Sequence, residues 1–323
     1  MTNKNFNNTA SPFLDGKRYY SLNDHCKKTF GEKVYRLSLN GGMTCPNRDG
    51  TYSTSGCLFC SEGGSGDFAS SGNLSITEQI IQAKERISAK TNCKKFIAYF
   101  QAYTNTYAPV SYLREIYMEA IRQPEICAIS IGTRSDCLGE EVISLLAELN
   151  TIKPVWVEIG LQSIHNTTLS AMNTQTTVEQ FDDALMRLNQ HQIPVIAHLI
   201  LGLPGETREM MLESVKHIAA LPVSGVKLQL LHVLKNTPLA KIYETAPFPV
   251  LSLEEYCDLV IDCVELLPPE MVIHRLTGDG PKKLLMAPLW SGDKKRVLNT
   301  LNQRFATRNS WQGKSIERGI SNG

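Results

Sequence analysis

Three cysteines on one polar loop are the residues of this chain best suited to metal chemistry. Cys45, Cys57 and Cys60 follow a C-x11-C-x2-C spacing among Gly, Ser, Asn and Asp residues. Thiolates bind both zinc and iron–sulfur clusters, and a complete site usually has four protein ligands. Three ligands leave one position open, where an iron could hold and activate a small molecule. The loop follows residues 34–39, whose alternating pattern predicts a strand.

Two other interpretations of these cysteines stay open at this point. A structural zinc site would need a fourth ligand, and His25 or Cys26 is close enough in sequence to provide it. A disulfide framework agrees less well with the chain, because its 9 cysteines are an odd number and no secretory signal is present. We therefore expect a reducing, cytoplasmic environment and a metal-binding loop.

The elements that would position this loop form an alternating series. Predicted strands cover residues 34–39, 96–100, 126–131, 155–159, 195–201 and 226–231, with a seventh at 271–273. Predicted helices lie at 76–87, 109–121, 140–149, 178–188, 208–220 and 253–266. Such alternation predicts βαβ units and a parallel sheet. The strands are too few for a closed eight-stranded barrel, so the sequence predicts an α/β fold with an open, partial (β/α)6-type TIM barrel.

Length and composition agree with one large core. The 323 residues are 42% hydrophobic, and barrels of roughly 200–250 residues commonly fold as one domain. We expect a polar, partly disordered segment at 1–30, the barrel at 31–250, and a helical, basic extension at 251–323. No apolar run reaches the ~18 residues of a membrane span, so no membrane association is expected.

Polar or glycine-containing segments follow the predicted strands. They are residues 101–105, 132–136, 158–163, 201–206, 232–237 and 274–279. In barrels the loops after the strands converge on one rim, where functional groups gather. The cysteine loop follows the first strand and would face the same rim. This coincidence favours a cavity site over a set of unrelated turns.

Individual side chains on this rim suit a small polar ligand. Arg134 can bind a carboxylate through two hydrogen bonds, and Glu158 can accept hydrogen bonds from ribose hydroxyls or an amine. Phe59, next to Cys60, can pack against a flat heterocycle beside the metal. Gly202 lets the backbone approach a ligand closely. The alternative for Arg134 and Glu158 is a salt bridge that lines the barrel.

Several of these strings together resemble the radical S-adenosylmethionine (SAM) superfamily. They are the cysteine loop with Phe59 before its last cysteine, the rim at 101–103, residues 158–162, and Leu-Gly-Leu-Pro-Gly-Glu at 201–206. The resemblance covers roughly residues 30 to 310. It is closest to the YhcC/YtqA group, which is related to the radical-SAM core of the Elongator catalytic subunit. The strings that match this group include residues 42–50, 98–106 and 273–281.

The resemblance implies a cofactor set and a role for each matching residue. Cys45, Cys57 and Cys60 would bind three irons of a [4Fe–4S] cluster, whose fourth iron would hold the amino and carboxylate groups of SAM. Reduction would split SAM and give a 5′-deoxyadenosyl radical, which takes hydrogen from the substrate. The residues that would contact SAM are Phe59 beside the cluster, Gln101 and Tyr103 near the methionine end, Arg134 as a brace, Glu158 and Gln162 at the ribose, and Gly202 and Pro204 beside the adenine. An electron donor such as flavodoxin or ferredoxin is implied as well.

Charge gives the first indication of a substrate. The formal net charge is +1, but between Lys282 and Arg318 nine Lys and Arg residues stand against two acidic ones. This run is either a solvated helix face or a nucleic-acid footprint. Together with the Elongator resemblance it favours tRNA. Members of the resembling group are linked with the wobble uridine, where a carboxymethylaminomethyl side chain is trimmed to aminomethyl. Lys235, Lys282 and Lys283 would then meet phosphate.

Two rivals from other classes stay open. One is a radical SAM enzyme that acts on a small metabolite or a protein side chain, and its activity would not depend on salt. The other is a zinc-clipped RNA-binding adaptor without catalysis, which would be colourless and would not bind SAM. The cysteine spacing alone does not separate these rivals, whereas the polar rim favours an enzyme.

Overall fold

The structure is a computed structural model, and it describes residues 15–64, 66, 69, 72–89, 91–278 and 280–316. Residues 1–14 of the segment 1–30, which the sequence predicts to be partly disordered, lie outside these described residues, whereas residues Leu22–Phe30 form a helix. Arg318, the last residue of the basic run, also lies outside the described residues. None of the helices in the described part of the chain combines the length and the apolar character needed to cross a bilayer.

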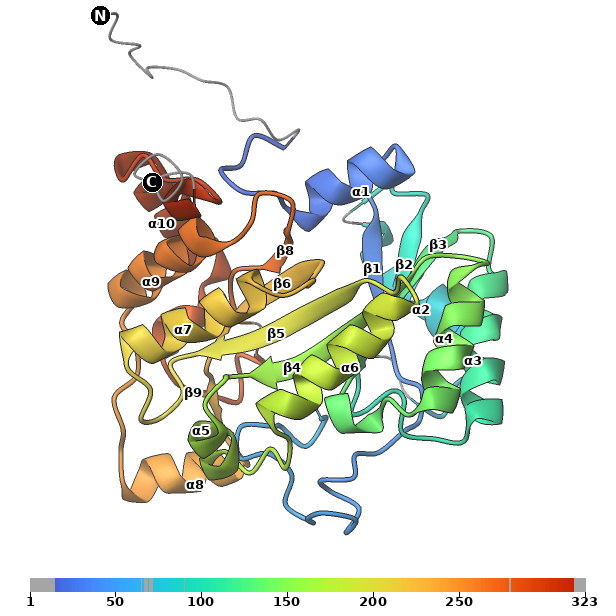
Figure 1. Cartoon of the computed structure of the whole chain (residues 1–323), viewed down its shortest axis with the longest axis horizontal. Helices are drawn as coiled ribbons and strands as arrows, with labels where there is room; N and C mark the ends of the chain where they lie inside the picture. Colours follow the sequence, from blue (N-terminus) through green and yellow to red (C-terminus); the bar gives the residue numbers. More distant parts are fainter. Residues whose placement is uncertain are drawn as a thin grey trace, which may run out of the picture.

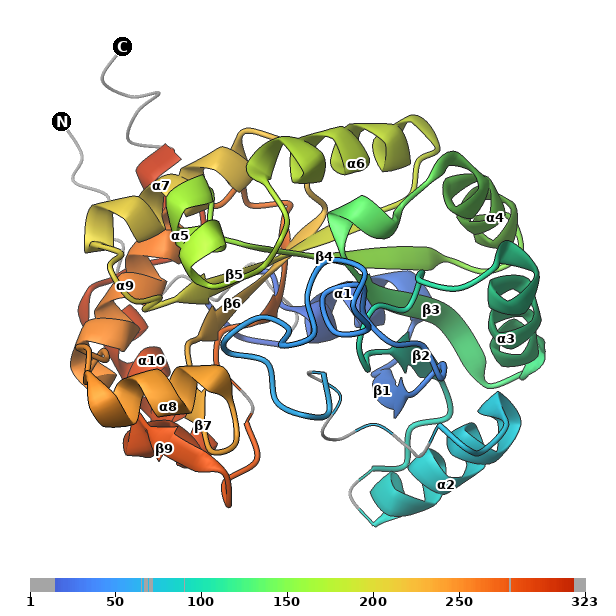
Figure 2. The ribbon, with the colours of Figure 1, turned by 90° about the horizontal axis from the view of Figure 1, so that it is seen from below.

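A seven-stranded parallel sheet forms the centre of the molecule. Its strands, in spatial order, are β1 (Tyr35–Leu39), β2 (Phe96–Phe100), β3 (Ile126–Thr133), β4 (Val155–Gln162), β5 (Val195–Leu201), β6 (Gly225–Leu230) and β8 (Val272–Arg275). This order follows the chain, as successive βαβ units require. Figure 2 shows the sheet curled into an open half-barrel. The predicted partial TIM barrel is therefore confirmed, with β8 as its seventh strand.

Helices cover the outer face of the sheet (Figure 1). They are α2 (Ile76–Ser88), α3 (Val110–Arg122), α4 (Glu140–Asn150), α6 (Val178–Gln190), α7 (Arg208–Ala219) and α9 (Leu253–Leu266). Their apolar faces and the outward side chains of the strands share one buried core. A capping box of Ser75 and Glu78 begins α2, where each side chain accepts a hydrogen bond from the other residue's backbone N–H.

A further helix, α1 (Leu22–Phe30), closes the amino-terminal end of the barrel. Its Cys26 is buried in a small cluster with residues near the beginning of four strands, namely Ile97, Ala128, Trp156 and Ile196. The ring of His25 lies edge-on to Trp156, with 5.8 Å between the centroids. Because the cysteine loop leaves the opposite end of β1, neither His25 nor Cys26 can complete a zinc site with it.

The region after residue 250 belongs to the same core. It contributes β8 to the main sheet, and α9 packs on both α7 and α10 (Lys294–Thr307). A two-stranded antiparallel ribbon, β7 (Val233–Leu234) with β9 (Leu285–Ala287), joins the two sides of the predicted division. Two short helices, α5 (Asn166–Ala171) and α8 (Pro238–Thr245), complete the rim. The core is thus continuous across residue 250.

The basic run near the C-terminus is partly neutralised within the fold. Arg304 binds Asp258, and Arg308 binds Asp262, so α10 is tied to the acidic face of α9. Lys314 lies 3.8 Å from Glu265 of the same helix. These three cations therefore serve helix packing, which corrects the view of the whole run as a nucleic-acid footprint. Lys282 and Lys283 remain exposed.

Candidate functional site

A cavity of about 240 Å³ lies at the carboxyl-terminal ends of the strands. Its lining brings together the predicted site residues Cys45, Cys57, Phe59, Cys60, Gln101, Tyr103, Arg134, Glu158 and Gln162. Two other predicted contacts, Gly202 and Pro204, are not among its described lining residues. The Gly202 N–H instead points to the Met211 sulfur on α7, at 3.0 Å. Their contact with an adenine stays a prediction.

Tight turns fold the cysteine loop into the mouth of the cavity. The Cys45 carbonyl accepts the backbone N–H of Arg48 at 2.8 Å, and the Cys57 carbonyl accepts that of Cys60 at 3.1 Å. The Arg48 guanidinium then donates to the carbonyls of Cys60, at 3.1 Å, and Ser61, at 2.6 Å. One arginine thus holds the first and last cysteines of the motif in the same small region.

Asparagines connect this loop to the segment after α5. Asn47 donates to the carbonyl of Asn173 at 2.6 Å, and its amide lies 3.5 Å from the Cys57 sulfur. Asn173 in turn donates to the Gly56 carbonyl at 2.7 Å. N–H donors near thiolate sulfurs are one of the means by which proteins adjust metal–thiolate centres. The loop is therefore fixed from the segment after α5 as well as from its own turns.

Arg134 braces the same region. It binds both oxygens of Asp136, at 2.9 and 2.8 Å, and donates to the Thr174 carbonyl at 2.8 Å. The carboxylate that Arg134 binds in this structure therefore belongs to Asp136 of the same chain. Burial opposes the charge on Arg134, but Asp136 and the thiolates of Cys45 and Cys57 raise its pKa. A permanent cation thus lies beside two of the three thiols.

The thiols interact with one another. A hydrogen bond with Cys60 and burial raise the pKa of the Cys57 thiol well above its usual value, while Arg134 and Asn47 oppose the shift. Metal binding requires the thiolate, so loading this loop must release protons. Both the cation and the amide donor favour that deprotonated form.

The donor set fits an iron–sulfur cluster better than zinc. Among the described residues no group of three or more His, Cys, Asp or Glu side chains surrounds a common point as a mononuclear metal would require. A cubane cluster asks for a different arrangement, because each thiolate binds its own iron. Three thiols with which the described part of the chain groups no fourth ligand match a cluster that keeps one iron open.

Gln162 supplies a second observation that points to a ligand. Its backbone has φ of 68°, a left-handed conformation, directly after a bulge in β4. Its Oε1 is buried without a hydrogen-bond partner among the described residues, although the side chain lines the cavity. Gly160 makes room for it, since a Cβ there would lie 2.5 Å from the Gln162 amide nitrogen. A ligand with hydroxyl or amine donors, such as SAM, would satisfy this oxygen.

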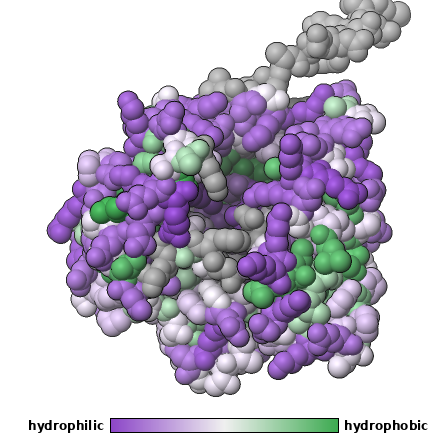
Figure 3. All heavy atoms as spheres, turned by 180° about the vertical axis from the view of Figure 1, so that it is seen from behind, coloured by the Kyte–Doolittle hydropathy of each residue, from purple (hydrophilic) through white to green (hydrophobic). Residues whose placement is uncertain are grey.

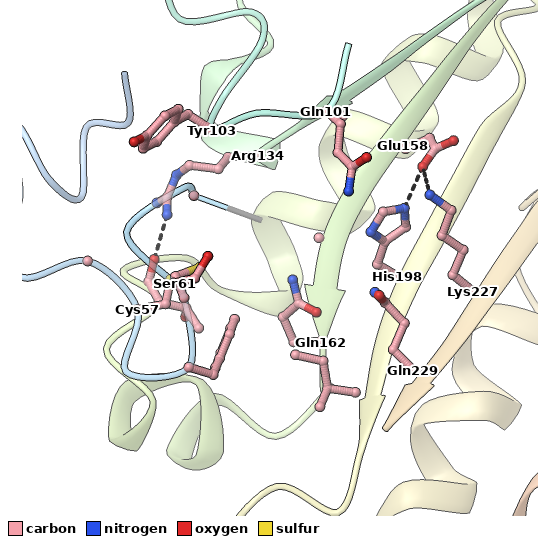
Figure 4. Close-up of a pocket in the computed structure, with 18 of the residues that line it drawn as sticks. Cys57, Ser61, Gln101, Tyr103, Arg134, Glu158, Gln162, His198, Lys227 and Gln229 are labelled. Carbon is pink, nitrogen blue, oxygen red and sulfur yellow. Dashed lines mark hydrogen bonds and ion pairs between the residues drawn. The ribbon is translucent and has the colours of Figure 1, made fainter. Parts of the chain in front are cut away.

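Gln101 and Tyr103 are held by the chain on the other side of the cavity. The Gln101 Oε1 accepts a hydrogen bond from Ser38 at 3.2 Å. Tyr103 also has a positive φ, of 60°, and its hydroxyl donates to the Glu62 carbonyl at 2.6 Å. Figure 4 shows the Gln101 and Gln162 side chains between the cysteine loop and Glu158. The middle of the cavity is therefore lined by amides and its two ends by charged or sulfur-bearing groups.

A buried ion network forms the floor (Figure 4). Glu158 is fully buried, and its Oε1 accepts a hydrogen bond from Ser130 at 2.7 Å and lies 3.5 Å from Arg36. Its Oε2 accepts from His198 at 2.8 Å and also binds Lys227. A carboxylate has about four acceptor positions, so these partners fill its capacity. For Glu158 the structure therefore contains the salt bridge that was the alternative to a ligand contact. A contact between Glu158 and a ribose stays a prediction.

The charges of this network follow from its burial. Burial on its own would raise the pKa of the Glu158 carboxyl, but Lys227 and Arg36 hold it well below the usual value. Burial lowers the pKa of Lys227 to about 7, with Glu158 opposing the shift and Arg36 and Arg275 adding to it. Burial and the Lys227 charge lower the pKa of His198 to about 4. Glu158 is thus ionised and His198 neutral at physiological pH.

The sequence analysis missed Arg36, Lys227 and Gln229 as lining or floor residues. A signal was available in β6, where Lys227 and Gln229 alternate with apolar residues. In a sheet buried on both faces, a polar residue at every second position marks the face toward the cavity. Arg36 and Ser38 follow the same period in β1.

Comparison with known proteins reaches the same family. Residues 45–218 match the model of the Radical SAM superfamily, and residues 223–307 match that of the Radical_SAM C-terminal domain. YtqA of Bacillus subtilis (strain 168) is 45% identical over 302 residues, which are 94% of each chain. The tRNA uridine(34) acetyltransferase of Methanocaldococcus jannaschii is 26% identical over 192 residues, which cover 58% of this chain and 34% of that protein.

A solved structure supports the fold. The archaeal Methanocaldococcus infernus Elp3 matches with a TM-score of 0.64 at 19% identity, over 84% of this chain and 63% of that chain. The superfamily model spans more than half of the sequence and starts at the first cysteine of the motif. With the half-barrel and the thiols at its mouth, these matches establish that the chain belongs to the radical SAM superfamily, whose members use a [4Fe–4S] cluster and SAM.

Proposed function

We propose that this protein is a radical SAM enzyme that trims the carboxymethylaminomethyl side chain of a tRNA wobble uridine to aminomethyl. The observation that carries the chemistry is the cavity itself, with three thiols at its mouth and the unsatisfied Gln162 oxygen inside it. The substrate is proposed because a relative over the barrel region is a tRNA uridine(34) acetyltransferase. Exposed lysines beside the mouth add to that argument.

The residues of the chain bind and orient in this scheme. Cys45, Cys57 and Cys60 would hold the cluster, and Phe59 would pack beside it. Bound there, a [4Fe–4S] cluster supplies the one-electron cleavage of SAM that yields a 5′-deoxyadenosyl radical. Gln162 would accept a hydrogen bond from SAM, and the closed barrel floor would exclude water from the reacting atoms.

The chemistry of the side chain sets the products. The substrate ends in –CH2–NH–CH2–COO⁻. Loss of a hydrogen atom, then of one electron and one proton, from the methylene beside the carboxylate gives an imine, which water converts to the aminomethyl group and glyoxylate. In this scheme the two electrons would be taken up by the cleavage of SAM to methionine and 5′-deoxyadenosine, so that one SAM and one water would be used per turnover. A flavodoxin or ferredoxin would provide the priming electron.

The RNA would meet the ribbon of β7 and β9. Lys235 and the pair Lys282 and Lys283 are exposed and come together there, because the Lys235 N–H donates to the Leu284 carbonyl at 2.7 Å. The same strand contributes Leu234 to the cavity lining. Figure 3 shows the molecule from behind, where hydrophilic side chains cover more of the surface than hydrophobic ones. Three phosphate contacts would give a log–log salt slope of about −2 to −3.

The experiment begins with protein reconstituted without oxygen. With SAM and dithionite it should form 5′-deoxyadenosine, and with tRNA that carries carboxymethylaminomethyluridine it should form aminomethyluridine and equimolar glyoxylate, measured by mass spectrometry of the nucleosides and by a glyoxylate assay. Formation of 5′-deoxyadenosine with unchanged tRNA would favour a small metabolite or protein side chain as substrate. A colourless protein that keeps zinc and leaves SAM intact would refute the enzyme and support the RNA-binding adaptor.

A further inference from the structure

The floor of the cavity is unusually cationic for a buried surface. Glu158 is the one acidic side chain among the described lining residues, whereas Arg48, Arg134, Lys227 and Arg275 also line the cavity. Arg48 and Arg134 lie at the mouth, where backbone carbonyls and Asp136 bind them. Lys227 and Arg275 lie on paired positions of β6 and β8, at the floor. The buried ammonium of Lys227 is therefore the charge to explain.

Lys227 is the centre of this excess. Its side chain is 2% exposed, and its Nζ contacts Glu158 and the Tyr99 hydroxyl, the latter at 3.0 Å. Glu158 is shared, because Arg36 lies 3.5 Å from its other oxygen. One carboxylate thus faces two cations. Burying an ammonium with only part of a counter-ion is unfavourable, and a hydrophobic pair would pack the same volume at least as well.

The other titratable groups around Lys227 do not balance it. Burial and the Glu158 charge raise the pKa of Tyr99 well above its usual value, so its hydroxyl stays neutral. His198 is neutral as well. Arg275 adds positive charge, since it is one of the causes that lower the pKa of Lys227. The described surroundings of Lys227 therefore favour the entry of a second anion.

We propose that Lys227 forms a binding site for the carboxylate of the substrate at the floor of the cavity. This inference rests on the proposed function, because the untrimmed wobble side chain ends in a carboxylate. With the carboxylate at the floor, the neighbouring methylene would be the next group toward the cysteine loop, where hydrogen is removed. The trimmed side chain has lost its carboxylate, so the same contact separates substrate from product.

The test compares charged and neutral forms of one ligand. Anaerobic calorimetry of the cluster-loaded protein with SAM, without reductant, would measure binding of the nucleoside 5-carboxymethylaminomethyluridine and of its methyl ester. Three proteins are compared, namely wild type, Lys227→Met and Lys235→Met. The Lys235 variant is the matched control, since it removes an exposed rim lysine and a nucleoside has no phosphate to meet it.

We expect wild type and Lys235→Met to prefer the acid at least tenfold at pH 6.5, and Lys227→Met to lose that preference. In wild type the preference should fall severalfold at pH 8.5, because Lys227 then has to take up a proton to bind the anion. A folded Lys227→Met protein that keeps the preference would overturn the proposal. So would a wild-type preference that is absent or equal at both pH values, which decides the matter even if the variant does not fold.

Binding of a small fragment of the substrate side chain tests the carboxylate site independently of the proposed function. N-methylglycine carries the same amine, methylene and carboxylate as the side chain, and N-methylglycinamide is its neutral counterpart. Saturation-transfer NMR could show a Lys227-dependent preference for N-methylglycine while the nucleoside does not bind. That result would support the carboxylate site and refute the wobble uridine as the substrate. If Lys227→Met trims tRNA with unchanged KM, the carboxylate site is refuted and the proposed function is supported.

Discussion

Replacing Glu158 by glutamine tests whether the floor of the barrel is held together by charge. The substitution keeps the volume of the side chain, removes its negative charge and turns one of its two acceptor oxygens into an NH2 donor. Lys227, 2% exposed, and Arg36, 17% exposed, would then face each other without a counter-ion. Removing one partner of a buried ion pair typically costs about 3–5 kcal/mol. We expect Glu158→Gln to lose that amount of folding free energy.

The expected change in melting temperature follows from the size of the chain. At about 2.1 cal/mol/K per residue, 323 residues give an unfolding entropy of about 0.7 kcal/mol/K. A loss of about 3–5 kcal/mol therefore lowers the melting temperature by about 4–7 °C. Anaerobic scanning fluorimetry of cluster-loaded proteins at one fixed scan rate would measure it, since unfolding with loss of iron is irreversible.

Two further proteins make the measurement specific. Glu148→Gln removes the same charge from an exposed pair with Arg114, where about 0–1 kcal/mol is expected. The double variant Glu158→Gln with Lys227→Met removes the stranded ammonium as well, and it should melt above Glu158→Gln alone. If Glu158→Gln melts within about 1 °C of wild type, as Glu148→Gln should, the buried network contributes little and the charge argument is refuted.

Three other predictions concern the mouth and the rim. Cys57→Ala should leave less than half of the iron and abolish formation of 5′-deoxyadenosine, as iron analysis and chromatography would show; full iron content would exclude the cysteine as a ligand. Lys282→Ala with Lys283→Ala should weaken tRNA binding and reduce the salt slope by about 1.4–1.8, measured by filter binding at several salt concentrations, and an unchanged slope would place the RNA elsewhere. Gly160→Ala should displace the Gln162 amide, whose nitrogen would lie 2.5 Å from the new Cβ, and weaken SAM binding more than tenfold in equilibrium dialysis with little change in stability.

The barrel could be predicted because its strands are buried on both faces. Such strands read as short apolar runs, and the bounds expected for 96–100 and 195–201 agree with β2 and β5. Helices between them begin at recognisable caps, as at Ser75. The rim of the cavity could be predicted from the strand order alone, because the loop after each parallel strand leaves the same end of the sheet.

Elements that depend on distant partners were not predictable. The ribbon of β7 and β9 is only two to three residues long on each side, and its strands meet across some fifty residues of chain. The pairing of Arg304 and Arg308 with the acids of α9 depends on how two helices pack. A run of basic residues carries no information about that neighbour, so the sequence alone could not tell an internal ion pair from an RNA-binding face.

Glu158 shows where the sequence argument stops and what the structure adds. A lone acid in an apolar strand was a recognisable signal, but its partner Lys227 is 69 residues away. They meet because β5 pairs His198 with Gly160 on one side and with Lys227 on the other. Once both oxygens of Glu158 are taken by the chain, the unsatisfied Gln162 oxygen is left as an acceptor for a ligand, and Lys227 is the cation that we propose for its carboxylate. The polarity of the cavity therefore favours a substrate that enters with its negative end toward the floor.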